Sequence, residues 1–434
     1  MNVTVVGGGL AGVEAAYALA SRGIKVTLYE MRPQKTTPAH KTENLAELVC
    51  SNSLKAMRHD SASGLLKEEM RLLGSLTLKA ADAASVPAGG ALAVDRRIFS
   101  EFITKAIENN PNITLIREEI TEIPDTPAII ASGPLTSDKL SEAIKKEIGD
   151  NALSFYDAAA PIVRADSIDY DKVFAAARYG RGDDDYINCP FEKEEYEAFY
   201  EALISAETAE LKEFEKQDFK VYEGCMPIEV MAKRGPDTLR FGPLKPVGLT
   251  NPKTGKRPYA VVQLRSEDRD RTNFNLVGFQ TNLRFPYQEK VFRMIPGLEK
   301  AVFTRYGVMH RNTFLNSPKV LDEYARLKEN LYFAGQITGV EGYMESAMSG
   351  IVAGINLYRT LNGKDPLKFP KETMIGALNN HISNDYTADF EPMGANMGIL
   401  PPSEERIKGK KERYTYLADR AIAAMTNFLK EKEI

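Results

Sequence analysis

Two cysteines stand in segments whose residue types suit chemistry on an electron-poor carbon. Cys225 is flanked by glycine in the string GCMPIEVMAKRG, and Cys50 lies in the polar string LVCSNSLK. A thiolate is a strong nucleophile, and C6 of a pyrimidine is one carbon that it attacks. Read alone, Cys225 fits a buried structural thiol better than a functional one. Cys189, in NCPF, is expected to be a packed core thiol.

A glycine-rich turn near the N-terminus predicts a dinucleotide site. Three glycines with the GxGxxG spacing let the chain bend sharply, approach a pyrophosphate and pack the following helix against the strand. Glu30 follows Gly12 by 18 residues, where a carboxylate accepts hydrogen bonds from ribose hydroxyls and disfavours NADP. Arg32 is expected either at an adenosine phosphate or in a surface ion pair. The expected residues of the turn are Gly7, Gly8, Gly9, Leu10, Ala11 and Gly12.

Two further segments favour FAD over NAD. NLYFAG, followed by Gln336 and a helix that begins near Gly342, resembles the second FAD segment of glutathione-reductase-like flavoproteins. In that segment the strand end, here Gly335 and Gln336, contacts the ribityl chain, and the helix N-terminus faces the flavin ring. Those proteins usually have Asp where this chain has Gln336. ASG at 131–133 resembles their ATG turn. Because no second GxGxxG and no CxxC pair occur, NAD(P)H is expected to bind transiently at the flavin.

Basic residues gather between residues 231 and 257 against a single acid, Asp237. Such a patch can supply salt-dependent contacts to RNA phosphates, or it can be a solvated loop. The residues expected at RNA are Lys233, Arg234, Lys245, Lys256 and Arg257.

The elements that must position these residues indicate an α/β protein. We predict a glutathione-reductase-like Rossmann FAD-binding domain interrupted by a smaller α+β insertion domain. The predicted parts are 1–160 and 329–434 for the FAD domain, the latter with a C-terminal helix, and 161–328 for an insertion on the RNA side. Expected strands are 2–6, 24–30, a pair within 113–123, 128–133 and 330–335. Expected helices are 13–22, 64–81, 95–108, 192–217 and 343–361.

Composition limits the class of protein. The 434 residues exceed one compact core, and the balance of 43% hydrophobic and 27% charged residues is that of a globular chain. Three cysteines form no disulfide framework and no zinc spacing, so we expect no metal and a reducing, cytoplasmic location. No signal peptide and no membrane span are expected. The net charge of −4 gives no global nucleic-acid signature, although a local basic face remains compatible with it.

Long strings along the whole chain resemble one family, the TrmFO (Gid) folate- and FAD-dependent tRNA (uracil-5-)-methyltransferases. They are more specific than a glycine fingerprint. The strings are LYEMRP at 28–33, AELVCSNSLK at 46–55, VPAGGALAVDR at 86–96, GCMPIEVMAKRG at 224–235, GKRPYAVVQLR at 255–265, YGVMHRNTF at 306–314 and FAGQITGVEGYMESA at 333–347.

The resemblance implies methylation of C5 of a uridine in the tRNA T-loop, at tRNA position 54. The carbon donor would be 5,10-methylenetetrahydrofolate, with reduced FAD as carrier and reductant and NAD(P)H as the source of electrons. Cys225 matches the family's nucleophile toward C6. Cys50 matches a second functional cysteine, either a base or a positioning group. The implied partners are tRNA and folate, with no membrane and no obligate protein partner.

Four alternatives stay open at this point. The related tRNA wobble-uridine carboxymethylaminomethyl enzyme carries a further C-terminal helical domain, for which this chain leaves no room. The same chemistry on a ribosomal RNA uridine is compatible with the sequence. A plain FAD oxidoreductase would need neither the cationic segment nor Cys225. A non-catalytic RNA-binding flavoprotein would need no nucleophile.

Overall fold

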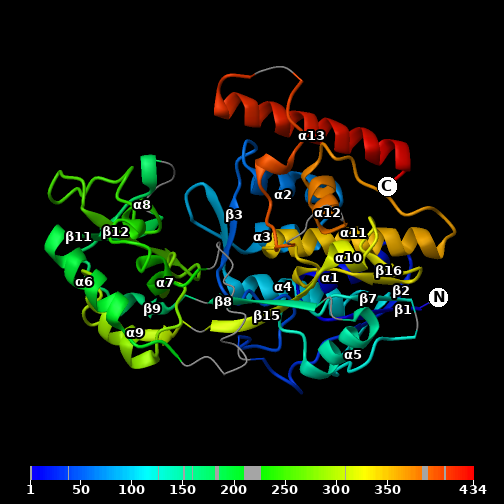
Figure 1. Cartoon of the computed structure of the whole chain (residues 1–434), viewed down its shortest axis with the longest axis horizontal. Coiled ribbons are helices and arrows are strands. Elements are labelled where there is room, and N and C mark those ends of the chain that lie inside the picture. Colours follow the sequence, from blue (N-terminus) through cyan, green and yellow to red (C-terminus); the bar gives the residue numbers. More distant parts are fainter. Residues whose placement is uncertain are drawn as a thin grey trace.

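The computed structural model describes residues 2–37, 39–125, 127–149, 152–158, 160–180, 185–209, 226–307, 309–383, 390–404 and 407–434. Within 152–158 and 309–313 it describes the backbone alone. The described chain has two lobes, each built on a six-stranded sheet (Figure 1). We name them the parallel-sheet lobe, which holds the N-terminus, and the antiparallel-sheet lobe.

The parallel-sheet lobe has the strand order β16-β17-β7-β1-β2-β6, in which only β16 runs antiparallel to its neighbour. Short apolar runs explain these strands, because both faces of the sheet are covered by helices. The strands are β1 (Asn2–Val6), β2 (Lys25–Tyr29), β6 (Ile113–Ile116), β7 (Ala128–Ile130), β16 (Arg326–Lys328) and β17 (Leu331–Phe333).

Side chains of β1 alternate between two separate cores. Val3 and Val5 belong to the large core, together with residues of α1 (Leu10–Ala20) and α11 (Tyr343–Leu361). Val6 belongs to a smaller core, together with residues of α5 (Asp138–Ile148). The helices of this lobe are α1 (Leu10–Ala20), α2 (Ala62–Leu72), α3 (Leu76–Ala84), α4 (Arg96–Glu108), α5 (Asp138–Ile148), α10 (Ser317–Val320), α11 (Tyr343–Leu361), α12 (Met374–Ser383) and α13 (Lys410–Lys432).

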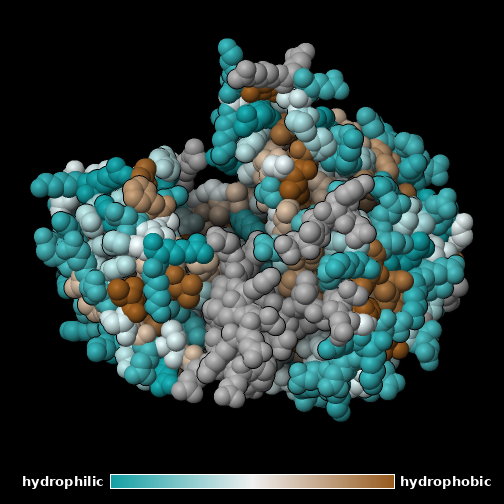
Figure 2. Space-filling model, in the orientation of Figure 1, coloured by the Kyte–Doolittle hydropathy of each residue, from teal (hydrophilic) through white to brown (hydrophobic). Residues whose placement is uncertain are grey.

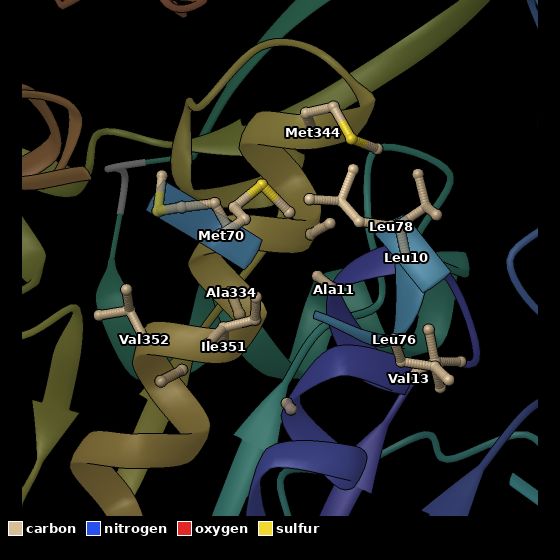
Figure 3. Close-up of a cluster of buried hydrophobic side chains, with 14 of the residues drawn as sticks. Leu10, Ala11, Val13, Met70, Leu76, Leu78, Ala334, Met344, Ile351 and Val352 are labelled. Atoms are coloured by element: carbon tan, nitrogen blue, oxygen red, sulfur yellow. The ribbon is translucent and has the colours of Figure 1, made fainter. Parts of the chain in front are cut away.

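Helices α1 and α11 approach closely because small residues face each other. A Cβ on Gly350 would lie 2.0 Å from the carbonyl oxygen of Ala11, and one on Gly354 would lie 2.9 Å from that of Ala15. Figure 3 shows the large apolar side chains that close this core, among them Met344 from α11 and Leu76 from α3. The close contact fixes the N-termini of α1 and α11 on the same side of the sheet.

The antiparallel-sheet lobe has the order β10-β11-β12-β13-β9-β14 and its own apolar core. Its strands are β9 (Ile162–Arg164), β10 (Phe174–Ala175), β11 (Tyr186–Phe191), β12 (Ala260–Ser266), β13 (Asn273–Leu276) and β14 (Phe303–Arg305). Its helices are α6 (Lys193–Ser205), α7 (Ile228–Ala232), α8 (Thr238–Phe241) and α9 (Phe285–Phe292).

Two chain crossings join the lobes. Strands β8 (Ala152–Ala158) and β15 (Met309–Leu315) pair antiparallel along their whole length between the lobes (Figure 1). A three-stranded sheet of β3 (Ser53–Ala56), β5 (Ala91–Val94) and β4 (Ser85–Val86) lies beside them. Four short 3-10 helices complete the described elements: η1 (Ala165–Ser167), η2 (Arg178–Gly180), η5 (Gln336–Thr338) and η6 (Met397–Ile399).

The predicted fold class is confirmed, and α11 has the predicted bounds. The single helix predicted over 64–81 is wrong, because Gly74 at φ +79° ends α2 and Ser75 caps α3. The strand pair within 113–123 is also wrong. Only β6 forms, since residues after Ile116 leave the sheet and line a cleft.

Helix α6 ends at Ser205, short of the predicted 217, and residues 210–217 lie outside the described ranges. The domain boundaries at 160 and 328 stay predictions.

Candidate active site and cofactor cleft

A cleft lies at the carboxyl ends of the parallel strands. This is the edge of an open α/β sheet where ligands bind. All three segments that the sequence predicts at FAD contribute to its lining: the glycine turn, the turn at 131–133 and the strand end at Gly335 and Gln336. Segments more than 300 residues apart therefore meet in one cleft.

The glycines of the turn are required for different reasons. Gly7 has φ +106°, and a Cβ on it would lie 2.4 Å from the carbonyl oxygen of Ala131. A Cβ on Gly12 would lie 1.8 Å from the carbonyl oxygen of Gly7. Gly9, in contrast, lines the cleft, and a Cβ there would meet no protein atom within 4 Å. Packing explains Gly7 and Gly12, whereas no protein contact explains Gly9.

The first turn of α1 is open to an anion. Gly9 begins the helix without a side-chain hydrogen bond to its N–H groups. Unsatisfied N–H groups at a helix N-terminus carry partial positive charge and bind phosphate. The residues present therefore fit the pyrophosphate of a dinucleotide.

Glu30 is buried beside this turn and retains one acceptor position. Its Oε2 accepts a hydrogen bond from the Gly8 N–H at 3.0 Å. Its Oε1 accepts from the Arg32 N–H at 3.0 Å and from Arg32 Nε at 2.9 Å. A carboxylate offers about four acceptor positions, so one remains, on Oε2, for a ribose hydroxyl.

Arg32 holds Glu30 in its charged form. Burial opposes ionisation of Glu30, but the hydrogen bonds and charge of Arg32 outweigh burial and hold the pKa of Glu30 below its usual value. The Arg32 side chain is itself buried, and its Nη1 lies 3.2 Å from Glu47 Oε2. Its ion pairs are thus buried, not the surface pair that one reading of the sequence allowed.

The second predicted segment begins α11. The Gly335 N–H donates to Ser349 Oγ at 2.6 Å, and Gln336 Nε2 donates to Glu341 Oε2 at 2.6 Å. Gly342, at φ +123°, begins α11 without a side-chain cap. A Cβ on Gly342 would lie 2.2 Å from Glu345 Oε2, so a larger residue does not fit. The N-terminus of α11 therefore stays free of side-chain caps next to the cleft.

Tyr343, which the sequence analysis did not single out, joins the cleft to Cys50. It lines the cleft, and its hydroxyl oxygen accepts hydrogen bonds from the N–H groups of Cys50 at 2.8 Å and Ser51 at 3.2 Å. A hydroxyl has one proton to donate and two lone pairs. Since both lone pairs are used, the proton is left for Cys50 Sγ, 3.0 Å away.

The Tyr343 hydroxyl is suited to remain that donor. Burial, with a further contribution from the charge of Cys50, raises the pKa of Tyr343 well above its usual value. A hydrogen bond received from a phenol favours the thiolate form of a cysteine over the thiol. Cys50 and the Tyr343 hydroxyl are therefore joined by a hydrogen bond at the edge of the cleft.

Arg96 fixes the backbone before Cys50 and links the two lobes. Its Nη1 donates to the carbonyl oxygen of Leu48 at 2.8 Å, and its Nε lies 2.6 Å from Glu267 Oε2. Next to this pair, Arg265 of β12 donates to Asn52 Oδ1 at 2.8 Å. The loop that carries Cys50 is thus held by residues of the antiparallel-sheet lobe.

Arg305 is a further cation near Cys50 that the sequence analysis did not single out. Burial lowers its pKa, and its charge interacts with those of Arg96 and Cys50. Its Nη2 is buried and has no hydrogen-bond partner among the described residues. In the sequence, only its position directly before the family string YGVMHRNTF could have pointed to Arg305.

The other predicted site residues are distributed as follows. Cys225 lies outside the described residues, which begin again at Met226. Cys189 is fully buried in the core of the antiparallel-sheet lobe, where burial raises its pKa, as expected for a packed thiol. In the described part of the chain, no three His, Cys, Asp or Glu side chains gather as metal ligands.

The five predicted RNA-contacting cations are all exposed. Two of them, Lys245 and Arg257, line one groove of the antiparallel-sheet lobe, whereas Lys233, Arg234 and Lys256 do not line it.

Comparison with known proteins gives full-length matches. A family model described as "Glucose inhibited division protein A" matches residues 2–365. The chain is 58% identical over 437 residues to a protein of Heliobacterium modesticaldum named methylenetetrahydrofolate--tRNA-(uracil-5-)-methyltransferase TrmFO, covering 100% of this chain and 99% of the relative. A protein of the same name from Listeria innocua is 57% identical over 98% of both chains.

Among solved structures, two crystal forms of Aquifex aeolicus GidA are similar. The form II structure has a TM-score of 0.73 at 19% identity, covering 99% of this chain and 73% of that one. The form I structure has a TM-score of 0.72 at 20% identity, covering 99% and 75%. At these identities the likeness establishes the fold.

Proposed function

This chain belongs to the TrmFO family of methylenetetrahydrofolate--tRNA-(uracil-5-)-methyltransferases, and from that premise we propose that it methylates C5 of a T-loop uridine in tRNA, at tRNA position 54. The carbon donor is 5,10-methylenetetrahydrofolate. The observation that carries the proposal is that one side chain, Tyr343, both lines the dinucleotide cleft and forms a hydrogen bond with Cys50 Sγ. The cofactor site and the Cys50 thiol thus lie on either side of the same side chain.

FAD, when bound in the cleft, supplies the two electrons of the reaction and carries the one-carbon unit. The N–H groups at the start of α1 would hold its pyrophosphate, and Glu30 would accept from its ribose. Gly335 and Gln336 would hold its ribityl chain, and the start of α11 at Gly342 would hold its ring. The absence of a side chain at Gly9, unexplained by any protein contact, supports this assignment.

Cys225 is the nucleophile in this proposal. Its thiolate adds to C6 of the uridine, and the electron pair moves onto the C4 carbonyl as an enolate. C5 then attacks the one-carbon unit. Loss of the C5 proton breaks the bond between that carbon and its carrier and leaves an exocyclic methylene on C5. Addition of two electrons and a proton, as hydride, turns the methylene into the methyl group, and the resulting enolate expels the Cys225 thiolate from C6. Cys50, which accepts a hydrogen bond from Tyr343, is placed to receive a proton in this sequence.

The cationic side chains Lys233, Arg234, Lys245, Lys256 and Arg257 contact RNA phosphates in this proposal. Their exposure supports it. The electrons come from NADH or NADPH, which binds transiently at the flavin. The enzyme acts in the cytoplasm and without an obligate protein partner. No helix within the described ranges has the length and apolar character needed to cross a membrane.

The test is a donor comparison with purified, flavin-loaded protein. Unmodified tRNA transcript is incubated with NADH or NADPH and carbon-labelled methylenetetrahydrofolate, and a parallel reaction contains labelled S-adenosylmethionine. We expect labelled 5-methyluridine at the T-loop from the folate donor alone. Label from S-adenosylmethionine alone would overturn the proposal. A ribosomal RNA fragment run beside the tRNA decides between the two substrates.

A further inference from the structure

Two aromatic side chains of the antiparallel-sheet lobe are unusually exposed. Phe241, the last residue of α8, is 83% exposed, and Tyr179 of η2 is 60% exposed. These are the two largest exposed fractions among the large hydrophobic side chains of the described ranges. Figure 2 shows a hydrophobic spot over α8 within a mostly hydrophilic surface. Such exposure forfeits the free energy of burial. Because single exposed apolar side chains are common on protein surfaces, the role of each depends on the groups around it.

The backbone of Tyr179 is held in an unusual conformation. Tyr179 has φ +60°, a left-handed conformation that is rare for a bulky residue and is retained mainly where neighbouring structure enforces it. Its N–H donates to the carbonyl oxygen of Gly248 at 2.9 Å, and Arg178 Nη1 donates to that of Val247 at 2.9 Å. The segment 245–248 is thus fixed with Tyr179 at one end.

Phe241 and residues 245–247 line one cationic groove. Arg240, Phe241, Lys245, Arg257 and Tyr259 line the groove. The Arg240 guanidinium lies 3.7 Å above the centre of the Tyr259 ring and is held by Asp237 at 2.6 Å. Lys245 and Arg257 are exposed, and neither has a carboxylate partner among the described residues.

We propose that this aromatic-cationic groove, defined as Phe241, Lys245 and Arg257, binds an unstacked segment of the RNA substrate. Phe241 stacks on a nucleobase, and Lys245 and Arg257 contact the flanking phosphates. The inference rests on the proposed function in that RNA is the substrate.

The residue types favour RNA over a protein partner. Aromatic platforms interleaved with cations bind bases by stacking and phosphates by charge. The centre of a protein interface, in contrast, is depleted in lysine, and Lys193 and Lys245 both line this groove. In this groove the cations lie directly beside the exposed ring, and the single acid of the lining, Glu192, caps α6.

The test measures tRNA binding by flavin-loaded protein over a series of salt concentrations, with a labelled transcript and fluorescence anisotropy. Phe241→Ala is expected to raise the Kd about tenfold, because stacking of one base is lost, without changing the salt dependence. Phe241→Trp is expected to restore binding. Arg257→Gln is expected to lower the slope of log affinity against log salt by about one.

Phe102→Ala is the matched control, since Phe102 is an exposed phenylalanine on α4, in the other lobe. Equal Kd values for Phe241→Ala and Phe102→Ala would overturn the inference. The inference would also be overturned if Phe241→Ala kept its RNA affinity but changed its molecular mass in light scattering, because Phe241 would then be a protein contact. Binding of tRNA without methylation would remove the proposed function alone, whereas the absence of tRNA binding would overturn both.

Discussion

The cofactor cleft and the Cys50 site adjoin at Tyr343 but are built from different kinds of groups. The glycine turn that forms one wall of the cleft is built from backbone and from glycines that lie close together in the sequence, such as Gly7, Gly8 and Gly9. The Cys50 site is formed by side chains from four distant segments, including Arg96, Glu267 and Tyr343. A backbone-built site depends on the absence of side chains, and a side-chain-built site depends on long-range packing.

The largest effect is expected where a side chain is added to the cleft. Gly9→Ala should leave stability almost unchanged, because a Cβ there meets no protein atom within 4 Å, yet should weaken FAD binding by roughly 100-fold or more. Charged hydrogen bonds of about 1.5–3 kcal/mol each would be lost to the pyrophosphate. Flavin absorbance per protein and the melting temperature measure the two effects.

Gly12→Ala is the companion variant for that prediction. Its Cβ would lie 1.8 Å from the Gly7 carbonyl oxygen, so both flavin and about 3 kcal/mol or more of stability should be lost. If Gly9→Ala bound a normal amount of flavin, the claim that Gly9 is needed for the ligand and Gly12 for packing would be wrong.

A buried carboxylate far from the cleft should control the pH dependence of stability. Glu69 of α2 accepts from the N–H groups of Met374 at 2.7 Å and Ile375 at 2.8 Å, at the start of α12. Burial raises the pKa of Glu69 from 4.5 to about 8, because no guanidinium offsets it as Arg32 does for Glu30. The protonated form is therefore favoured in the folded chain.

The sign of the effect follows from this raised pKa. The contribution of protonated Glu69 to the free energy of unfolding is complete below about pH 4.5 and is lost as pH rises through about 8. The free energy of unfolding should fall by up to about 1.4 kcal/mol per pH unit within that window. Glu69→Gln should flatten the slope of melting temperature against pH, whereas Glu108→Gln on the surface should not. Parallel slopes for the wild type and Glu69→Gln would contradict the assignment.

A smaller effect, about tenfold in rate, is expected from Tyr343→Phe. The substitution removes the proton donor to Cys50 Sγ and the acceptor for two backbone N–H groups. In a Cys225→Ala background, alkylation of Cys50 at neutral pH should slow, because a smaller fraction is thiolate. Tyr332→Phe is the control, since its hydroxyl contacts Thr360 instead. An unchanged alkylation rate would show that Tyr343 does not act on the sulfur.

The smallest effect is expected from the cations outside the groove. Lys256 is exposed but does not line the groove that holds Arg257. Lys256→Gln should therefore raise the Kd for tRNA about twofold or less, and less than Arg257→Gln does, at one fixed salt concentration. Equal effects would indicate a diffuse cationic surface in place of a defined groove.

The sequence predicted local features well. The strand β1, the glycine turn, α1 and Glu30 are fixed by hydrophobic period and spacing over 30 residues, and α11 by its run of small residues. The proposed strand pair within 113–123 was wrong because alternation does not tell whether a partner strand is present. The uridine chemistry came from the resemblance of long strings and not from residue spacing.

Long-range features could not be predicted from pattern. Nothing in the spacing of Cys50 and Tyr343, separated by 293 positions, shows that the hydroxyl meets the sulfur. The pair of Arg96 with Glu267 across the lobes is equally hidden, since both residues look like ordinary surface charges in the sequence. Such contacts depend on how the antiparallel-sheet lobe docks on the loop that carries Cys50.

The central claim, that a cysteine and a bound flavin act together on a tRNA uridine, is tested most directly by trapping the covalent adduct. The wild type and Cys225→Ala are incubated with tRNA containing 5-fluorouridine in the T-loop, together with methylenetetrahydrofolate and NADH or NADPH. Fluorine at C5 blocks loss of the proton, so the adduct cannot resolve. We predict a denaturation-stable protein–RNA complex whose linked peptide contains Cys225, with none from Cys225→Ala. An adduct at another residue, or product formation by Cys225→Ala, would contradict the account.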